Sequence, residues 1–170
     1  MKLLRGLAAV TCLLASIAGH AQGAAKARAE TEALARAALP AAQEMLLAHG
    51  EFAPFGMGMG AGDEVVDIKN ANQGTDRADP ADPVSVLRRS LAEAMRLGRV
   101  RATALVYEAR LELAPPAASA EAIAIALAHR DGYAAIVVYP YQFRDGRIAV
   151  GEPHLIEQKP VPKAPPKRRK

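Results

Sequence analysis

The sequence predicts an α+β domain of two layers, in which two helices pack on an antiparallel sheet of about five strands. Two segments, residues 27–48 and 83–97, repeat apolar residues at the three- and four-residue spacing of a helix. Five shorter segments alternate apolar residues with others, which is typical of strands. The order α-β-β-α-β-β-β lacks the regular strand–helix alternation of parallel sheets, so it favours an antiparallel sheet.

The first helix is expected over residues 27–48. Its apolar positions recur on one side, at Leu34, Ala38, Ala41, Met45 and Ala48. Glu30 suits the positive N-terminal end, and Gly50 suits the position just after the last turn. Pro40 lacks an amide hydrogen, so we expect it to kink this helix or to split it in two.

Two short strands are expected next, at residues 51–59 and 64–68. The first alternates three large apolar residues, Phe55, Met57 and Met59, with Gly56 and Gly58. A glycine face predicts a close approach, and we expect this strand to pack tightly under the first helix. A turn at Gly60–Asp63 joins the pair, and a polar loop follows over residues 69–82.

The second helix is expected to begin at Pro83. Asp82 before it supplies an N-terminal cap, and proline is favoured at the first helical position. The apolar stripe of this helix comprises Val84, Leu87, Leu91 and Met95. Gly98 follows its end. These features predict a helix with one buried side.

Three longer strands are expected at residues 100–113, 121–129 and 133–143, with a short one at 147–150. In the second of these, large apolar residues alternate with alanines, and the alanine face predicts a closely packed helix. Asp131–Gly132 predicts a two-residue type I′ turn between the last two long strands. The resulting order of elements resembles that of the profilin-like and roadblock/longin folds, a resemblance that implies a fold and no activity.

The N-terminal residues 1–21 read as a secretory signal peptide. Lys2 and Arg5 precede an uncharged, mostly apolar stretch, and small residues allow cleavage after Ala21, with Ala24 or Ala25 as the alternative. The apolar stretch spans about 13 residues, which is short for a spanning helix, although an uncleaved anchor is the second reading. Cleavage would remove Cys12, the single cysteine, so we expect an exported protein without thiol chemistry.

The charge of the chain is concentrated at its ends. The net charge is +4, but residues 1–5 and 159–170 hold eight of the 22 basic residues and none of the 18 acids, so the middle carries −4. This distribution argues against a nucleic-acid-binding domain, in which the fold itself should be basic. We divide the chain into the signal peptide, one domain over residues 22–158, and a Pro-, Lys- and Arg-rich tail over 159–170.

Few residues suit catalysis. His129 beside Asp131 is the best acid–base pair, and His154 near Glu152 is a second. The serines lie outside the Gly-x-Ser-x-Gly pattern of a nucleophile elbow. Asp131 is better explained by the turn that it occupies. A small hydrolase-like periplasmic enzyme using His129 is therefore the alternative function, and not the first.

Metal and cofactor patterns are equally sparse. His49 with Met57 and Met59 offers soft ligands for copper, although methionines at strand spacing are typical of a core. The loop carboxylates Asp76, Asp79 and Asp82 lack the calcium-loop pattern, and the glycines at 56–62 lack the phosphate-loop pattern. We predict no cofactor, with a metal or ligand carrier as a further alternative.

Two features favour binding. Tyr139, Tyr141 and Phe143 share one face of the last long strand, and they form either part of the core or a partner-binding stripe. The tail, with the cluster Lys167, Arg168, Arg169 and Lys170, favours anionic envelope surfaces. The sequence therefore predicts an exported bacterial interaction domain that binds a protein or small-molecule partner through the face or the edge of its sheet.

Overall fold

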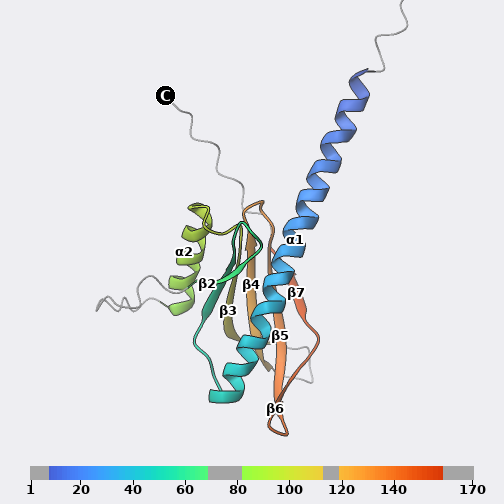
Figure 1. Cartoon of the computed structure of the whole chain (residues 1–170). Helices are drawn as coiled ribbons and strands as arrows, with labels where there is room; N and C mark the ends of the chain where they lie inside the picture. Colours follow the sequence, from blue (N-terminus) through green and yellow to red (C-terminus); the bar gives the residue numbers. More distant parts are fainter. Residues whose placement is uncertain (1–7, 69–81, 113–118, 159–170) are drawn as a thin grey trace, which may run out of the picture.

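The computed structural model describes residues 8–68, 82–112 and 119–158, with side chains from residue 22 onward. Two helices pack on one antiparallel sheet, which confirms the predicted fold class (Figure 1). The helices are α1 (Ala8–His49) and α2 (Pro83–Arg96). The strands are β1 (Phe55–Met59), β2 (Val65–Ile68), β3 (Ala102–Leu111), β4 (Ala120–His129), β5 (Ala134–Arg144), β6 (Arg147–Val150) and β7 (His154–Glu157).

The sheet follows the order β2-β1-β3-β4-β5-β6, and β7 also pairs with β5. All pairs are antiparallel, and β3 and β4 form the long centre of the sheet through ten paired residues. β7 is a strand that the sequence pattern did not predict, because it is only four residues long and every residue in it is exposed. Apolar and polar residues alternate along a strand only when one face of that strand is buried, so a fully exposed strand leaves no such pattern in the sequence.

β6 and β7 lie end to end along β5 and form one interrupted edge. Tyr141 of β5 pairs with Val150, whereas Val138 pairs with His154, so three edge residues stand opposite two residues of β5. This extra residue makes a bulge around Pro153, and bulges and prolines are common at sheet edges. Because of this extra residue, residue positions of the same parity point to opposite faces of the sheet in β6 and in β7.

α1 covers one face of the sheet and forms the larger core with it. The buried residues of α1 are mostly small, so the helix axis approaches the strands closely; they are Ala27, Thr31, Leu34, Ala35, Ala38, Ala42 and Leu46. The facing strand residues include Ile123, Ile125 and Leu127 of β4 and Ala102, Ala104 and Val106 of β3, all of them buried. The alanine face of β4, which was expected to let a helix pack closely, is turned away from α1, and its Ala126 packs beside α2.

α2 packs on the opposite face, so the sheet lies between the two helices in three layers, where the sequence predicted two layers. Leu87 and Leu91 contact Leu105 of β3, with Ala126 of β4 beside them. The glycines of β1 face this helix, because a Cβ atom at Gly56 would lie 2.9 Å from Leu91 Cδ2. The prediction that these glycines lie under the first helix is therefore wrong: α1 covers the methionine side of β1 instead.

Asp82 explains where α2 begins, and the packing around Pro40 explains why α1 is continuous. Asp82 caps α2 by accepting hydrogen bonds from the Val84 amide (3.2 Å) and the Ser85 hydroxyl (3.0 Å), as predicted. α1 continues through Pro40 as one helix, so the expected split does not occur. Pro40 is exposed, and packing on both sides of it holds the helix together despite the missing hydrogen bond. None of the helices in the described ranges is long and apolar enough to cross a membrane.

The β4–β5 connection differs from the predicted type I′ turn. The Gly132 amide donates to the His129 carbonyl (2.9 Å), and the His129 amide donates to the Tyr133 carbonyl (2.8 Å). Only Gly132 has a positive φ, whereas a type I′ turn needs two such residues. The loop is therefore the three-residue kind, in which a single left-handed glycine follows an ordinary turn.

Candidate functional site

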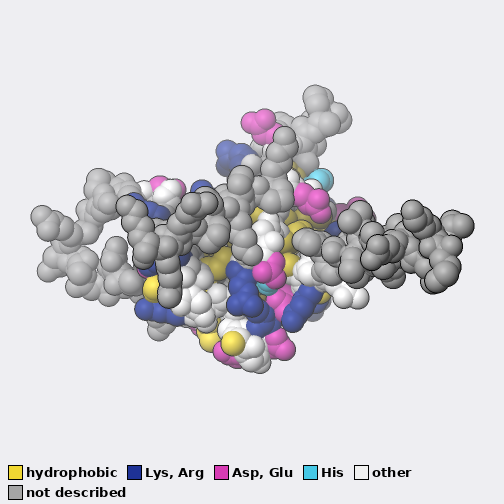
Figure 2. Space-filling view, turned by 90° about the horizontal axis from the view of Figure 1, so that it is seen from above, with side chains coloured by type: hydrophobic (Ala, Val, Ile, Leu, Met, Phe, Trp, Pro, Cys, Tyr) yellow, Lys and Arg dark blue, Asp and Glu magenta, His cyan; other side chains and the backbone are white. Residues whose placement is uncertain are grey.

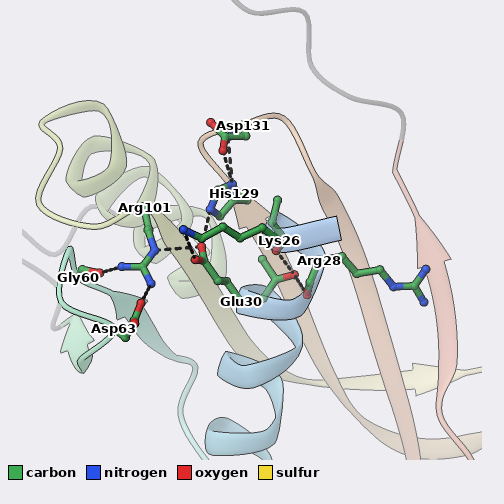
Figure 3. A network of polar contacts seen from close by, with 10 residues as sticks. Lys26, Arg28, Glu30, Gly60, Asp63, Arg101, His129 and Asp131 are labelled. Atoms are coloured by element: carbon green, nitrogen blue, oxygen red, sulfur yellow. Dashed lines mark hydrogen bonds and ion pairs between the residues drawn. The ribbon is translucent and has the colours of Figure 1, made fainter. Parts of the chain in front are cut away.

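A cluster of buried charged side chains lies at the end of the sheet where α1 leaves it. Its centre is Arg101, which directly precedes β3 and is only 9% exposed. The Arg101 Nε donates to Glu30 Oε2 of α1 at 2.9 Å. Its two terminal nitrogens donate to the Gly60 carbonyl and to the Asp63 carboxylate in the β1–β2 turn (Figure 3). One guanidinium thus joins three elements.

His129 is the second partner of Glu30. Its ring is 3% exposed, and its Nε2 lies 2.9 Å from Glu30 Oε2. The Asp131 amide donates to His129 Nδ1 at 3.1 Å. Because a ring nitrogen that accepts a hydrogen bond carries no hydrogen, Nδ1 is the acceptor in this arrangement and Nε2 is the nitrogen that donates to Glu30. The Asp131 carboxylate lies 3.6 Å from Nδ1.

The charges of the cluster stabilise one another. Burial raises the pKa of Glu30, but hydrogen bonds from Arg101 and His129 outweigh it, and the pKa of Glu30 is lowered overall. The hydrogen bond to Glu30 raises the pKa of Arg101 against the opposing effect of burial, and Asp63 adds to the increase. Lys26 lies 3.7 Å from the other Glu30 oxygen. Glu30 is therefore ionised at neutral pH.

Four elements bring these residues together: α1, the β1–β2 turn, the residue before β3, and the β4–β5 loop. Seen from this end of the molecule, basic and acidic side chains lie next to one another around a histidine (Figure 2). The sequence predicted His129 and Asp131 as neighbours, but it did not reveal Glu30 and Arg101 as their partners. The available indication was Arg101 itself, a charged residue between the apolar Val100 and Ala102.

The arrangement favours a structural role for His129. Both ring nitrogens of His129 have partners, and Glu30 accepts from two donors through one oxygen. A general base needs a free nitrogen within reach of a substrate proton. In this geometry the cluster binds the helix to the sheet, and a substrate would have to displace Glu30 to reach Nε2. His154, the other candidate histidine, and Glu152 are exposed.

The three candidate metal ligands lie in different surroundings. Met59 is buried and Met57 half-buried, and both pack in the core under α1. His49 is exposed at the end of α1, where it lines an open depression of about 480 Å³ together with Met45, Glu51, Phe52 and Ala53. In the described part of the chain, no three His, Cys, Asp or Glu residues are placed to hold a metal ion. Asp76 and Asp79 lie outside that part.

The aromatic stripe of β5 divides between core and surface. Tyr141 is 7% exposed and Tyr139 half-buried, and both pack in the core under α1. Phe143 is 54% exposed, and its ring meets the Tyr141 ring edge-on at 5.8 Å between centroids. The basic residues of the tail, Lys167, Arg168, Arg169 and Lys170, lie outside the described residues.

Comparisons with other proteins give no further guide to this site. No protein-family model, no curated protein and no solved structure matches the chain. The resemblance to profilin-like and roadblock/longin folds is therefore limited to the order of the elements. What the protein does has to be inferred from its own surfaces.

Proposed function

We propose that this protein is a binding module, which takes up an extended segment of a partner protein along the outer edge of β7. The supporting observation is a pair of exposed apolar residues on an edge strand, Leu155 at 45% and Ile156 at 51% exposure. Among the described strands, only β5 pairs with β7. An exposed apolar edge is both a binding surface and an aggregation hazard, so proteins seldom keep one without a use for it.

The backbone of β7 offers hydrogen bonds to a partner. The Gln158 amide donates to the Ala134 carbonyl at 2.9 Å, which marks this pair as hydrogen-bonded within the antiparallel ladder. Such pairs alternate with pairs whose backbone groups point outward. The alternation directs the N–H and C=O groups of Leu155 and Glu157 away from β5. A partner strand can bond to them, as in other cases of strand addition.

The side chains of β7 define what kind of segment fits. Leu155 pairs with Val137 on the face that α1 covers, and Ile156 pairs with Ile136 on the face that α2 covers. A partner strand beside β7 would thus meet an apolar side chain on each face of the sheet. Cross-strand apolar pairs stabilise a sheet, so the expected partner is an extended segment with apolar residues at consecutive positions.

The expected contact with a partner strand is confined to β7. The bulge around Pro153 separates β7 from β6, and a partner strand cannot follow both in one register. β2 at the opposite edge is a competing site, because Val65 and Val66 there are 44% and 38% exposed. β7 is preferred because all four of its residues are exposed.

Binding rather than catalysis is also favoured by the cluster around Glu30. The histidine that would act as general base is engaged there in structural contacts. Export to the periplasm or beyond, and attraction of the basic tail to anionic envelope surfaces, are part of the same proposal. They are supported by the composition of residues 1–21 and 159–170 alone.

The proposal is tested by removing one outward hydrogen bond from β7. Leu155→Pro removes the outward N–H without removing a bond to β5, whereas Leu155→Val keeps the N–H and serves as the matched control. A photo-crosslinking amino acid at position 156 in each protein then captures the partner in the cell envelope. We expect a discrete adduct with the wild-type and Leu155→Val sequences and its loss with Leu155→Pro.

Two further positions locate the contact. The same photo-crosslinker at Val66 tests the β2 edge, and at Ala92 on the exposed side of α2 it measures background. An adduct of equal yield from position 92 would overturn the proposal, as would a strong adduct from position 66 with none from position 156. A melting temperature of Leu155→Pro close to that of wild type is required for the comparison to count.

A further inference from the structure

The attachment of α1 to the sheet begins at one turn of the helix. Ala27 and Thr31 are the first buried residues of α1 among its described side chains, at 1% and 0% exposure. None of the residues 22–26 is buried, and the helix continues beyond the sheet in that direction (Figure 1). The cluster around Glu30 therefore lies where α1 parts from the sheet.

Apolar contacts hold α1 more strongly further along the helix. Leu34 and Leu46 are fully buried against the sheet, whereas the turn at residues 27–31 contributes only Ala27 and Thr31 to the interface. An alanine buries little apolar area, so its contribution is small. The Thr31 hydroxyl donates to the carbonyls of Ala27 (3.0 Å) and Arg28 (2.9 Å), and these bonds stay within the helix. The attachment of this turn therefore depends on Glu30.

We propose that Glu30, Arg101 and His129 form a latch that sets where α1 leaves the sheet, and that loss of the Glu30 charge releases residues 22–31 while the rest of the domain stays folded. This inference does not depend on the proposed binding function. The latch is closed by two bonds of 2.9 Å to a single carboxylate oxygen. Removing that charge leaves Arg101 buried with weaker partners, and buried cations without a counter-charge are costly.

Acid should open the latch, since Glu30 is the group whose charge closes it. The charged and titratable groups that face it come from four elements: Lys26 on α1, Arg101 before β3, His129 with Asp131 in the β4–β5 loop, and Asp63 in the β1–β2 turn. The pKa of Glu30 is lowered from its ordinary 4.5, so the latch is closed at neutral pH. It opens as the pH falls below 4.5 and through the lowered value.

Hydrogen–deuterium exchange of the whole chain tests the latch with Glu30→Gln. The matched control is Glu32→Gln, which removes a carboxylate two residues away that is 45% exposed and pairs with Arg28 on the same helix. We expect Glu30→Gln to accelerate exchange of amides at residues 24–33 by about tenfold or more, until they are close to unprotected, while β4 amides remain strongly protected. Protection that persists at residues 24–33, or that is lost in β4 together with them, would overturn the latch.

The wild-type protein provides the same test without a substitution. Between neutral pH and about pH 3.5, and after correction for intrinsic exchange, protection should fall first at residues 24–33 and only later in β4. Simultaneous loss of protection in both regions would mean that the cluster is an ordinary part of the cooperative core. This measurement decides the proposal even if Glu30→Gln does not fold.

Discussion

Glu30 Oε2 on α1 and Arg101 Nε before β3 lie 2.9 Å apart although 71 residues separate them in the chain. Both side chains are close to fully buried, so each is the main reason that the other is tolerated there. The same oxygen also accepts from His129, which is 99 residues from Glu30. The contact therefore ties the first helix to the centre of the sheet.

Replacing Glu30 by Ala should lower the free energy of unfolding by about 3 kcal/mol, because the exposed Asp63 carboxylate is then the counter-charge that remains for the buried Arg101 guanidinium. Urea unfolding measures the change. Glu93→Ala is the matched control: it breaks the exposed ion pair with Arg96 and should change stability very little. A Glu30→Ala loss no larger than that of the control would contradict the importance of the cluster.

Global stability should depend on pH through Glu30. Its pKa is lowered in the folded protein, because hydrogen bonds from Arg101 and His129 outweigh the effect of burial. Stability from this group is therefore fully present above its ordinary value of 4.5 and lost as the pH falls through the lowered value. Urea unfolding of wild type and Glu30→Gln over this range should converge at the acid end. Parallel curves would show that Glu30 does not titrate as inferred.

Replacing Gly58 by Ala should destabilise the sheet by about 1–3 kcal/mol, since an added Cβ overpacks a filled site. The new Cβ would lie 2.6 Å from Val100 Cγ1 and 2.7 Å from Ile68 Cδ1. Gly23→Ala, which meets nothing within 4 Å, serves as the control and should be neutral or slightly stabilising. Partial recovery in Gly58→Ala combined with Val100→Ala would identify the clash as the cause; a fully stable Gly58→Ala protein would exclude it.

Replacing Leu91 by Asp should destabilise by more than about 3 kcal/mol, because it buries a charge without a partner under α2. Leu91 is 4% exposed and contacts the glycine face of β1. Ala92→Asp on the exposed side of the same helix should have little effect. Thermal unfolding compares the two, and equal melting temperatures would mean that the buried face of α2 is misassigned.

Deleting residues 159–170 should leave the melting temperature nearly unchanged and weaken retention on anionic vesicles. The deleted segment carries six basic residues and no acid, each worth about 1 kcal/mol near an anionic membrane and screened by salt. Co-sedimentation with anionic and with neutral vesicles measures the difference. Unchanged retention would remove the tail from the proposed function, and an unfolded product would mean that it belongs to the domain.

The elements of this fold were predictable because their patterns are local. Asp82 and Pro83 begin α2 where the sequence indicates, and the alternation of Phe55, Met57 and Met59 with glycines predicts β1 as a strand. Both effects involve only neighbouring residues, so a short stretch of sequence contains all that is needed. Short, fully exposed β7 has no such pattern, and it became a strand only because β5 extends far enough to pair with it.

The sequence by itself determined the α+β class, the start of α2 and the proximity of His129 to Asp131. Tertiary structure decided that α2 and not α1 covers Gly56, and that His129 meets Glu30 and Arg101. These contacts join residues far apart in the chain. The same hydrophobic periodicity is compatible with many different pairings of the charged side chains. Only the packing of the helix against the sheet brings one such pairing within hydrogen-bond distance and removes it from water.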